Sequence, residues 1–319
     1  MAKGLFSVII ELLNTTRQLP LMDCLRPRLV WLISNLLREP TEHNSTIEFV
    51  HQISAAVNFV RDSFLMSLAS QIIEECSFAL FYLSGYNASV ARILASDPLL
   101  MRRISELLLH ESLVLQVNVV SILCNVGMDD SGAYLAYVDN HLLNGLHYCL
   151  LRGAGSSNLQ IAVLTFVSNL ICENNLMLNA IIGHSVSASI RDLCLIESQH
   201  GLVLREAALV LCNMSLFMNQ SQLNYLLLHQ YPEFFLNFME RSVNQEKVVF
   251  LLLNATLNFI QKGEEAKSEH GQNAVLGDML SKEKQWEEVL LRLGDRYGDG
   301  VTPVWKLVKQ LSLIINNYN

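Results

Sequence analysis

Asparagine side chains recur at one position of several apolar segments, and they offer the clearest chemistry in the sequence. The segments end at Asn35, Asn125, Asn169, Asn213 and Asn258, and a further one ends at Tyr82 instead. A side-chain amide donates and accepts hydrogen bonds, so a row of amides can satisfy the main chain of an extended peptide. Burying an amide without a partner is costly. The amides must therefore either bond a neighbouring helix or line an exposed surface, and we expect them to lie exposed.

Other reactive residue types form no catalytic or metal-binding pattern. His141 and His147 lie near each other but six residues apart, which does not suit a metal pair at i, i+4 on a helix. The seven cysteines include no C-x-x-C pair, and their apolar surroundings indicate buried reduced thiols. There is also no glycine-rich phosphate loop and no nucleophile elbow. We expect no enzyme activity, no metal and no cofactor.

The segments that carry the asparagines repeat at a regular interval. Their last residues stand at 35, 82, 125, 169, 213 and 258, which gives separations of 47, 43, 44, 44 and 45 residues. Periods of 40–47 residues are typical of armadillo and HEAT repeats, in which each unit is a small group of helices. The sequence therefore predicts an all-α armadillo-repeat solenoid, a right-handed superhelix of about six to seven three-helix repeats.

The remaining segments complete this organisation. Two further apolar helices, 91–95 and 99–109, precede the repeat helix at 117–126. The long polar stretch 262–285 is expected to be a loop before an atypical last unit, whose helices would be 286–293 and 305–315. The whole chain is interpreted as one solenoid with repeats at about 1–44, 45–90, 91–133, 134–177, 178–221 and 222–266, and a C-terminal cap at 267–319.

Composition excludes several classes of function. Hydrophobic residues make up 51% of the chain and charged residues 16%, and the mean hydropathy is +0.30. No apolar run approaches the roughly 20 residues of a membrane span. The net charge of −8 speaks against a nucleic-acid binder. Without a signal peptide at the start, we expect an intracellular protein of the cytoplasm or nucleus.

Several of the repeat segments resemble the third helices of the importin-α family. The stretch from Leu25 to Arg38 is similar to the fourth armadillo repeat of that family, with its Trp-x-x-x-Asn signature, and Phe78–Tyr82 resembles the fifth, where tyrosine replaces asparagine. Arg205–Asn213 resembles the eighth repeat, Leu253–Gln261 the ninth and Trp305–Tyr318 the tenth. The resemblance covers nearly the whole chain but only the fourth to tenth repeats of the family.

The resemblance implies a peptide-binding groove. In the family, tryptophans stack on the stems of Lys and Arg side chains of a nuclear-localisation signal, while asparagines bond its main chain. The implied partner-binding residues are Trp31, Asn35, Phe78, Tyr82, Asn125, Asn169, Glu206, Asn213 and Asn258. Three later stacking positions carry Ser121, Thr165 and Leu209 instead, so we expect basic signals to bind weakly.

Two functions remain open from the sequence. The first is a protein-binding adaptor, similar to importin-α, that holds an extended segment in a concave groove and works with transport receptors. Residues 1–28 contain no basic cluster, so we expect no direct binding to importin-β. The second is a structural armadillo subunit of a large protein assembly, with no role in transport. The missing aromatic residues at three stacking positions favour the structural subunit. The Trp, Tyr and Asn residues that recur in the order of the family favour descent from an importin-α-like adaptor.

Overall fold

The computed structural model is all-α over the residues that it describes. These are residues 8–9, 11–13, 22–38, 47–127, 138–152, 156–173, 175–196, 199–270, 275, 277, 279, 281–298 and 302–318, and they include no β-strand. Contacts between helices group the chain into two compact units, Met1–Ala162 and Val163–Asn319. The boundary falls inside a helix, so the repeat boundaries expected from the sequence stay a prediction. Each unit is described by itself.

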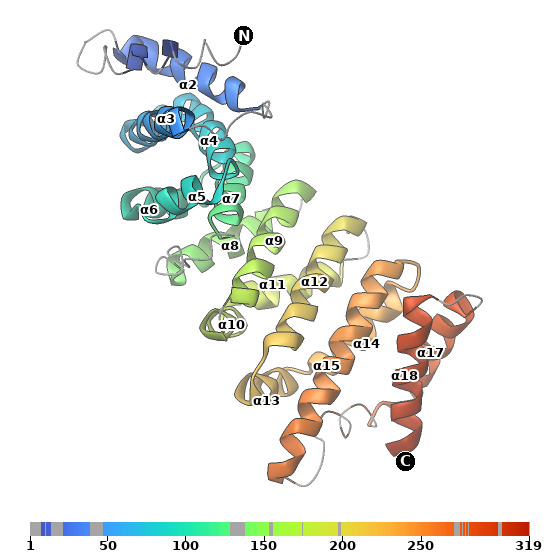
Figure 1. Cartoon of the computed structure of the whole chain (residues 1–319). Helices are drawn as coiled ribbons and strands as arrows, with labels where there is room; N and C mark the ends of the chain where they lie inside the picture. The colour runs from blue at the N-terminus through green and yellow to red at the C-terminus, as the bar shows by residue number, and fades with distance from the viewer. Residues whose placement is uncertain are drawn as a thin grey trace. The chain divides into compact units, whose positions relative to one another are not determined.

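The first unit is a stack of helices built around three that lie side by side (Figure 1). Its helices are α2 (Met22–Arg38), α3 (Ile47–Met66), α4 (Ser70–Ser84), α5 (Ala88–Ala95), α6 (Pro98–Leu107), α7 (Leu113–Val126) and α8 (Asn140–Arg152), and it includes the start of α9 (Ser157–Glu173). Helix α4 packs against both α2 and α7. These three helices carry the apolar segments that end at Asn35, Tyr82 and Asn125, as the sequence predicts.

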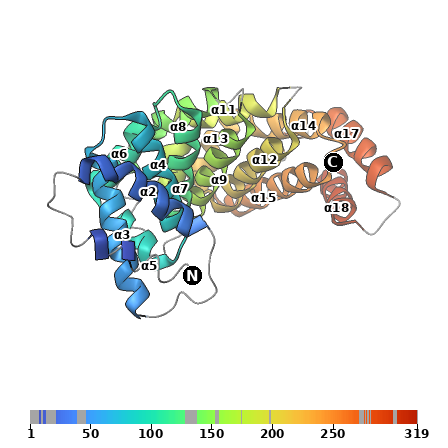
Figure 2. The same cartoon turned by 90° about the horizontal axis from the view of Figure 1, so that it is seen from above.

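The second unit repeats this arrangement. After the rest of α9 come α10 (Asn175–Ile182), α11 (Ser185–Cys194), α12 (Gly201–Phe217), α13 (Gln220–Leu228), α14 (Tyr231–Arg241), α15 (Glu246–His270), α17 (Glu283–Tyr297) and α18 (Pro303–Tyr318). Helix α15 packs between α12 and α18. Seen from above, these three lie along one side of the unit, with α11, α14 and α17 along the other (Figure 2).

Local sequence explains where many of these helices begin. Asn87, Asp97 and Ser112 each accept a hydrogen bond from a main-chain N–H in the first turn of α5, α6 and α7. Asn219 forms a complete capping box with Gln222 at the start of α13. Such caps satisfy donors that have no partner within the helix, and each contributes about 1 kcal/mol.

The polar stretch that begins at residue 262 differs from the sequence-based expectation of a loop. The structure continues α15 through His270, so the first part of the expected loop is helix. Lys262 and Gln261 both bond the Glu265 carboxylate, at 3.0 and 3.2 Å. Pairs at i, i+3 and i, i+4 support a helix that has no apolar face. The two helices expected in the C-terminal cap are confirmed as α17 and α18.

Apolar side chains fill the spaces between the helices of each unit. Trp286 of α17 is fully buried, as are Phe235 and Phe259, whose rings meet edge to face at 5.2 Å between centroids. Burial raises the pKa of the Cys124 and Cys149 thiols to about 12, so both stay protonated at neutral pH. No helix in the described part of the chain is both long and apolar enough to cross a membrane.

Candidate protein-binding surface

The expected binding residues lie on adjacent third helices in both units. We call Trp31, Asn35, Phe78, Tyr82 and Asn125 the first ladder, on α2, α4 and α7. We call Asn169, Glu206, Asn213 and Asn258 the second ladder, on α9, α12 and α15. The regular spacing of the sequence thus brings each ladder onto three neighbouring helices within its unit.

The first ladder begins with an aromatic side chain at the surface. Trp31 is 54% exposed, although it belongs to a helix whose neighbouring residues Ile33 and Ser34 are buried. Asn35 is also exposed, one turn further along α2, and its Nδ2 donates to the main-chain oxygen of Trp31 at 2.8 Å. An exposed indole beside an exposed amide can hold an apolar or cationic side chain while the amide bonds a main chain.

Tyr82 occupies the next position of the first ladder. The ring is half-buried and contacts the ring of Phe81, with centroids 5.2 Å apart. Arg38 of α2 donates from Nε to the Tyr82 hydroxyl at 3.3 Å. The phenol therefore ties α4 to α2 near the surface. Phe78, one turn earlier on α4, is half-buried as well.

Asn125 holds α7 to α4 rather than standing open to solvent. Its Nδ2 donates to the Ser84 hydroxyl at 2.9 Å and to the Phe81 main-chain oxygen at 3.3 Å. A Cβ on Gly85 would lie 3.2 Å from this nitrogen. Glycine at that position therefore gives the amide room to reach α4.

The second ladder uses its amides in the same way. Asn213 of α12 donates from Nδ2 to the Ser168 hydroxyl at 2.8 Å and to the Cys172 sulfur at 3.2 Å, both on α9. Asn258 of α15 donates to the Ser215 hydroxyl of α12 at 3.1 Å. Asn169 is half-buried.

These bonds correct the expectation of a fully exposed amide ladder. Asn125, Asn213 and Asn258 are half-buried, and each bonds the preceding third helix. In each case the acceptor is the hydroxyl oxygen of a buried serine on that helix, Ser84, Ser168 or Ser215, so the amide supplies a donor to an oxygen that is shielded from water. Each amide still carries a second N–H and a side-chain oxygen. Among the described residues no side chain is seen to bond that oxygen.

Sequence reasoning missed these three serines. Ser84 and Ser215 follow the ladder residue of their own helix by two positions, whereas Ser168 precedes it by one. A search for one fixed register could not have aligned them. A similar bond joins Asn118 of α7 to Ser77 of α4 at 2.9 Å, and both residues are buried.

Glu206 lies in a more enclosed setting than the other residues of the second ladder. The side chain is buried, and its Oε1 pairs with Nη2 of Arg205 at 2.6 Å. Arg205 also donates from Nε to the same oxygen at 3.1 Å. The neighbouring cation neutralises the carboxylate, so this position presents little negative charge to a ligand.

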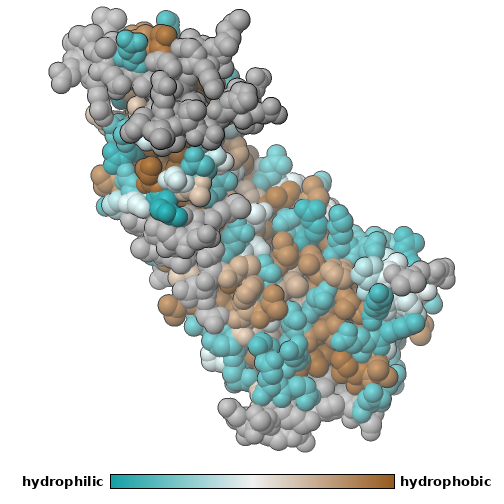
Figure 3. Space-filling view, viewed as in Figure 1, coloured by the Kyte–Doolittle hydropathy of each residue, from teal (hydrophilic) through white to brown (hydrophobic). Residues whose placement is uncertain are grey.

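The second unit instead exposes apolar side chains near its ladder. Leu202 and Leu216 of α12 and Phe250 of α15 are exposed, and Leu209 is half-buried. Figure 3 views the side on which α12, α15 and α18 lie, and it shows apolar patches among polar ones over this unit. The surface there suits an apolar partner better than a cationic one.

No group of three potential metal ligands occurs within the described residues. His141, which sequence analysis weighed as a ligand, is exposed on α8. The side chains of the two ladders are amides, aromatic rings and one paired carboxylate, which are groups suited to binding.

Comparison with solved structures identifies the fold. No family model matches the sequence, and no curated protein is significantly similar to it. A crystal structure of an engineered protein matches 98% of this chain and 68% of its own, at 16% identity and a TM-score of 0.67. Computationally designed armadillo repeat proteins for modular peptide recognition match 79% of this chain and 98% of their own, at 15% identity and a TM-score of 0.62.

The chain has an armadillo-type fold. A designed armadillo repeat protein in complex with the peptide (KR)4 also matches, over 79% of this chain and 98% of its own, with 16% identity and a TM-score of 0.58. Identities this low establish the all-α solenoid architecture and not a shared ligand. The armadillo class expected from the repeat period is confirmed.

Proposed function

We propose that this armadillo chain is a protein-binding scaffold that holds an extended segment of another protein along its first ladder. It would act without catalysis, in the cytoplasm or nucleus, as an adaptor similar to importin-α and served by transport receptors. The observation that carries the proposal is Trp31, whose ring is 54% exposed beside the exposed amide of Asn35. The ring and the amide lie four residues apart on α2, so both can contact one ligand on the same face of the helix.

Two features of the first unit support an extended basic peptide as the ligand. An indole face attracts a Lys or Arg side chain by about 0.5–2 kcal/mol. The amides of Asn35 and Asn125 lie on α2 and α7, on either side of the Tyr82 position on α4. Each amide retains an acceptor that could bond a peptide N–H.

The second unit favours the other function that the sequence left open. There the amides bond the stack, Glu206 is paired, and Leu202, Leu216 and Phe250 are exposed. Such a surface suits a permanent apolar contact in a large assembly. A fixed structural role for this unit is therefore our second candidate.

A titration of the full chain with fluorescein-labelled (Lys-Arg)4 peptide tests the first candidate. At about 0.15 M salt, which screens unspecific attraction, fluorescence anisotropy should show binding. Trp31→Ala should weaken it about two- to thirtyfold, the range that corresponds to a cation–π contact.

Tyr148→Ala is the matched control, because Tyr148 is an exposed aromatic of the same unit on α8. Equal affinities for the wild type, Trp31→Ala and Tyr148→Ala would show that the peptide binds through net charge alone. That result would exclude the first ladder as the binding site of a basic peptide.

A further inference from the structure

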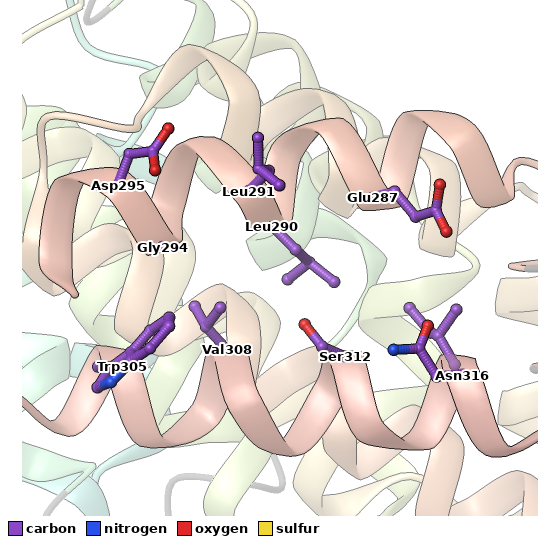
Figure 4. Close-up of a pocket in the computed structure, with 10 residues that line it drawn as sticks. Glu287, Leu290, Leu291, Gly294, Asp295, Trp305, Val308, Ser312 and Asn316 are labelled. Atoms are coloured by element: carbon purple, nitrogen blue, oxygen red, sulfur yellow. The ribbon is translucent and has the colours of Figure 1, made fainter.

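A groove opens between the last two helices of the second unit. Helices α17 and α18 run antiparallel, so that Asp295 lies near Trp305 at one end and Glu287 near Asn316 at the other (Figure 4). The cavity between them has a volume of about 590 Å³. Neither ladder contributes to it.

The α17 wall of the groove is a single helical stripe. Glu287, Leu291 and Asp295 follow one another at intervals of four residues, so their side chains share one face. Leu291 is 70% exposed. The opposite wall comes from α18, where Trp305 and Val308 lie toward one end and Asn316 toward the other.

This stripe is distinct from the face with which α17 joins the stack. Trp286, Val289 and Leu293 are buried, and Arg292 pairs with Glu240 of α14 at 2.6 Å. The last unit of a repeat array normally presents a polar outer face to water. Here Leu291 is instead exposed beside the buried apolar side chains that form the floor of the groove, Leu290, Val308 and Ile315. Such an arrangement is typical of a surface on which another helix packs.

The charges around the groove define its partner. The two charged residues that line it, Glu287 and Asp295, are both acidic and exposed. Within the described residues neither forms an ion pair, and the nearby cation Lys309 instead lies 4.7 Å over the Trp305 ring. Eight residues of α17 separate the two carboxylates, which corresponds to about 12 Å along the helix.

We propose that this groove binds an amphipathic helix of a partner protein whose apolar stripe is flanked by Lys or Arg residues. The apolar stripe of the partner would cover Leu291 and the floor beneath it. Two basic residues seven or eight positions apart would reach Glu287 and Asp295. A helix suits the groove because ridges of side chains spaced at i, i+4 fit between two packed helices.

The probe is an 18-residue helical peptide (its length chosen as about five turns) with leucines at helical spacing and flanking lysines. A sister peptide carries glutamate in place of every lysine. With the full chain, isothermal titration should show binding of the lysine peptide and not of the glutamate peptide. Leu291→Gln should weaken the lysine peptide at least about tenfold.

Leu313→Gln is the matched control, because Leu313 of α18 is 61% exposed but does not line the groove. The pair Glu287→Lys and Asp295→Lys should reverse the preference, so that the glutamate peptide binds better. Glu111→Lys with Asp192→Lys, at two exposed acids outside the groove, makes the same change in net charge and should leave the preference for the lysine peptide unchanged. Circular dichroism confirms that each variant is folded.

Three results would overturn the proposal. The lysine peptide would fail to bind, or it would bind equally to Leu291→Gln and Leu313→Gln. Alternatively, sedimentation would show a dimer of the chain that Leu291→Gln dissociates, which would make a second copy the occupant.

Discussion

The two ladders occupy the same register of the same kind of helix, yet they present different surfaces. In the first unit Trp31 and Asn35 are exposed to solvent, and the Tyr82 hydroxyl accepts a hydrogen bond from Arg38. In the second unit the described amide bonds run to buried serines, as the bond of Asn125 does in the first unit, but the neighbouring exposed residues are leucines and Phe250. A repeated residue therefore does not imply a repeated role, because the helix before it decides what its side chain meets.

The largest expected effect is a difference in stability between the alanine variants of two tryptophans, one buried and one exposed. Trp286→Ala should lower the free energy of unfolding by about 3–5 kcal/mol, because it removes a fully buried ring. Trp31→Ala should change it by less than about 0.5 kcal/mol, because that ring is mostly in water. Urea unfolding followed by circular dichroism measures both. A large loss of stability in Trp31→Ala would give Trp31 a packing role and remove the main support for peptide binding.

The next effect is a difference in stability between removing an amide that bonds a buried serine and removing an exposed amide. Asn213→Ala should cost about 1–3 kcal/mol, because it leaves the buried Ser168 hydroxyl without its donor. Asn35→Ala should cost less than about 0.5 kcal/mol, because Asn35 is exposed and bonds only its own helix. Denaturation midpoints of the two variants compare these positions directly. Equal midpoints would mean that the bond from Asn213 to Ser168 adds nothing to stability.

The smallest expected effect is a change in the affinity for a basic peptide. Thr165→Trp together with Leu209→Trp introduces aromatic rings at two half-buried positions of the second unit. Each exposed ring should contribute about 0.5–1 kcal/mol toward a basic peptide, so (Lys-Arg)4 should bind the double variant several-fold more tightly. An unchanged affinity in a folded double variant would exclude this unit as a basic-peptide site and favour the structural role.

Much of the fold could be predicted from the sequence, because the period of the asparagine-ended segments fixes which helices repeat. All six segments lie in helices of the structure. The continuation of α15 past Lys262 could not be predicted from hydrophobic periodicity, because Lys262 and Glu265 support that helix through charge. Contacts between polar side chains one turn apart thus continue α15 where the helix has no apolar face.

The candidate site was less predictable. Sequence analysis located Trp31 and Asn35, and the structure exposes both. It could not show that Asn213 and Asn258 bond Ser168 and Ser215, because such contacts join residues 45 and 43 positions apart. Sequence analysis also missed the groove beside Leu291, although the sequence contains a pattern that indicates it. An acid, a leucine and an acid at intervals of four residues mark one helical face.

The bridges from asparagine to serine have a mechanical consequence in the second unit. Asn213 ties α12 to α9, and Asn258 ties α15 to α12, so these two successive junctions each carry a bond of their own. Bonds placed one after another along a stack bear a pulling load in series, and every junction feels the full tension. The weakest junction then gives way alone while its neighbours stay closed. Such a unit would lengthen under load in steps, one repeat at a time.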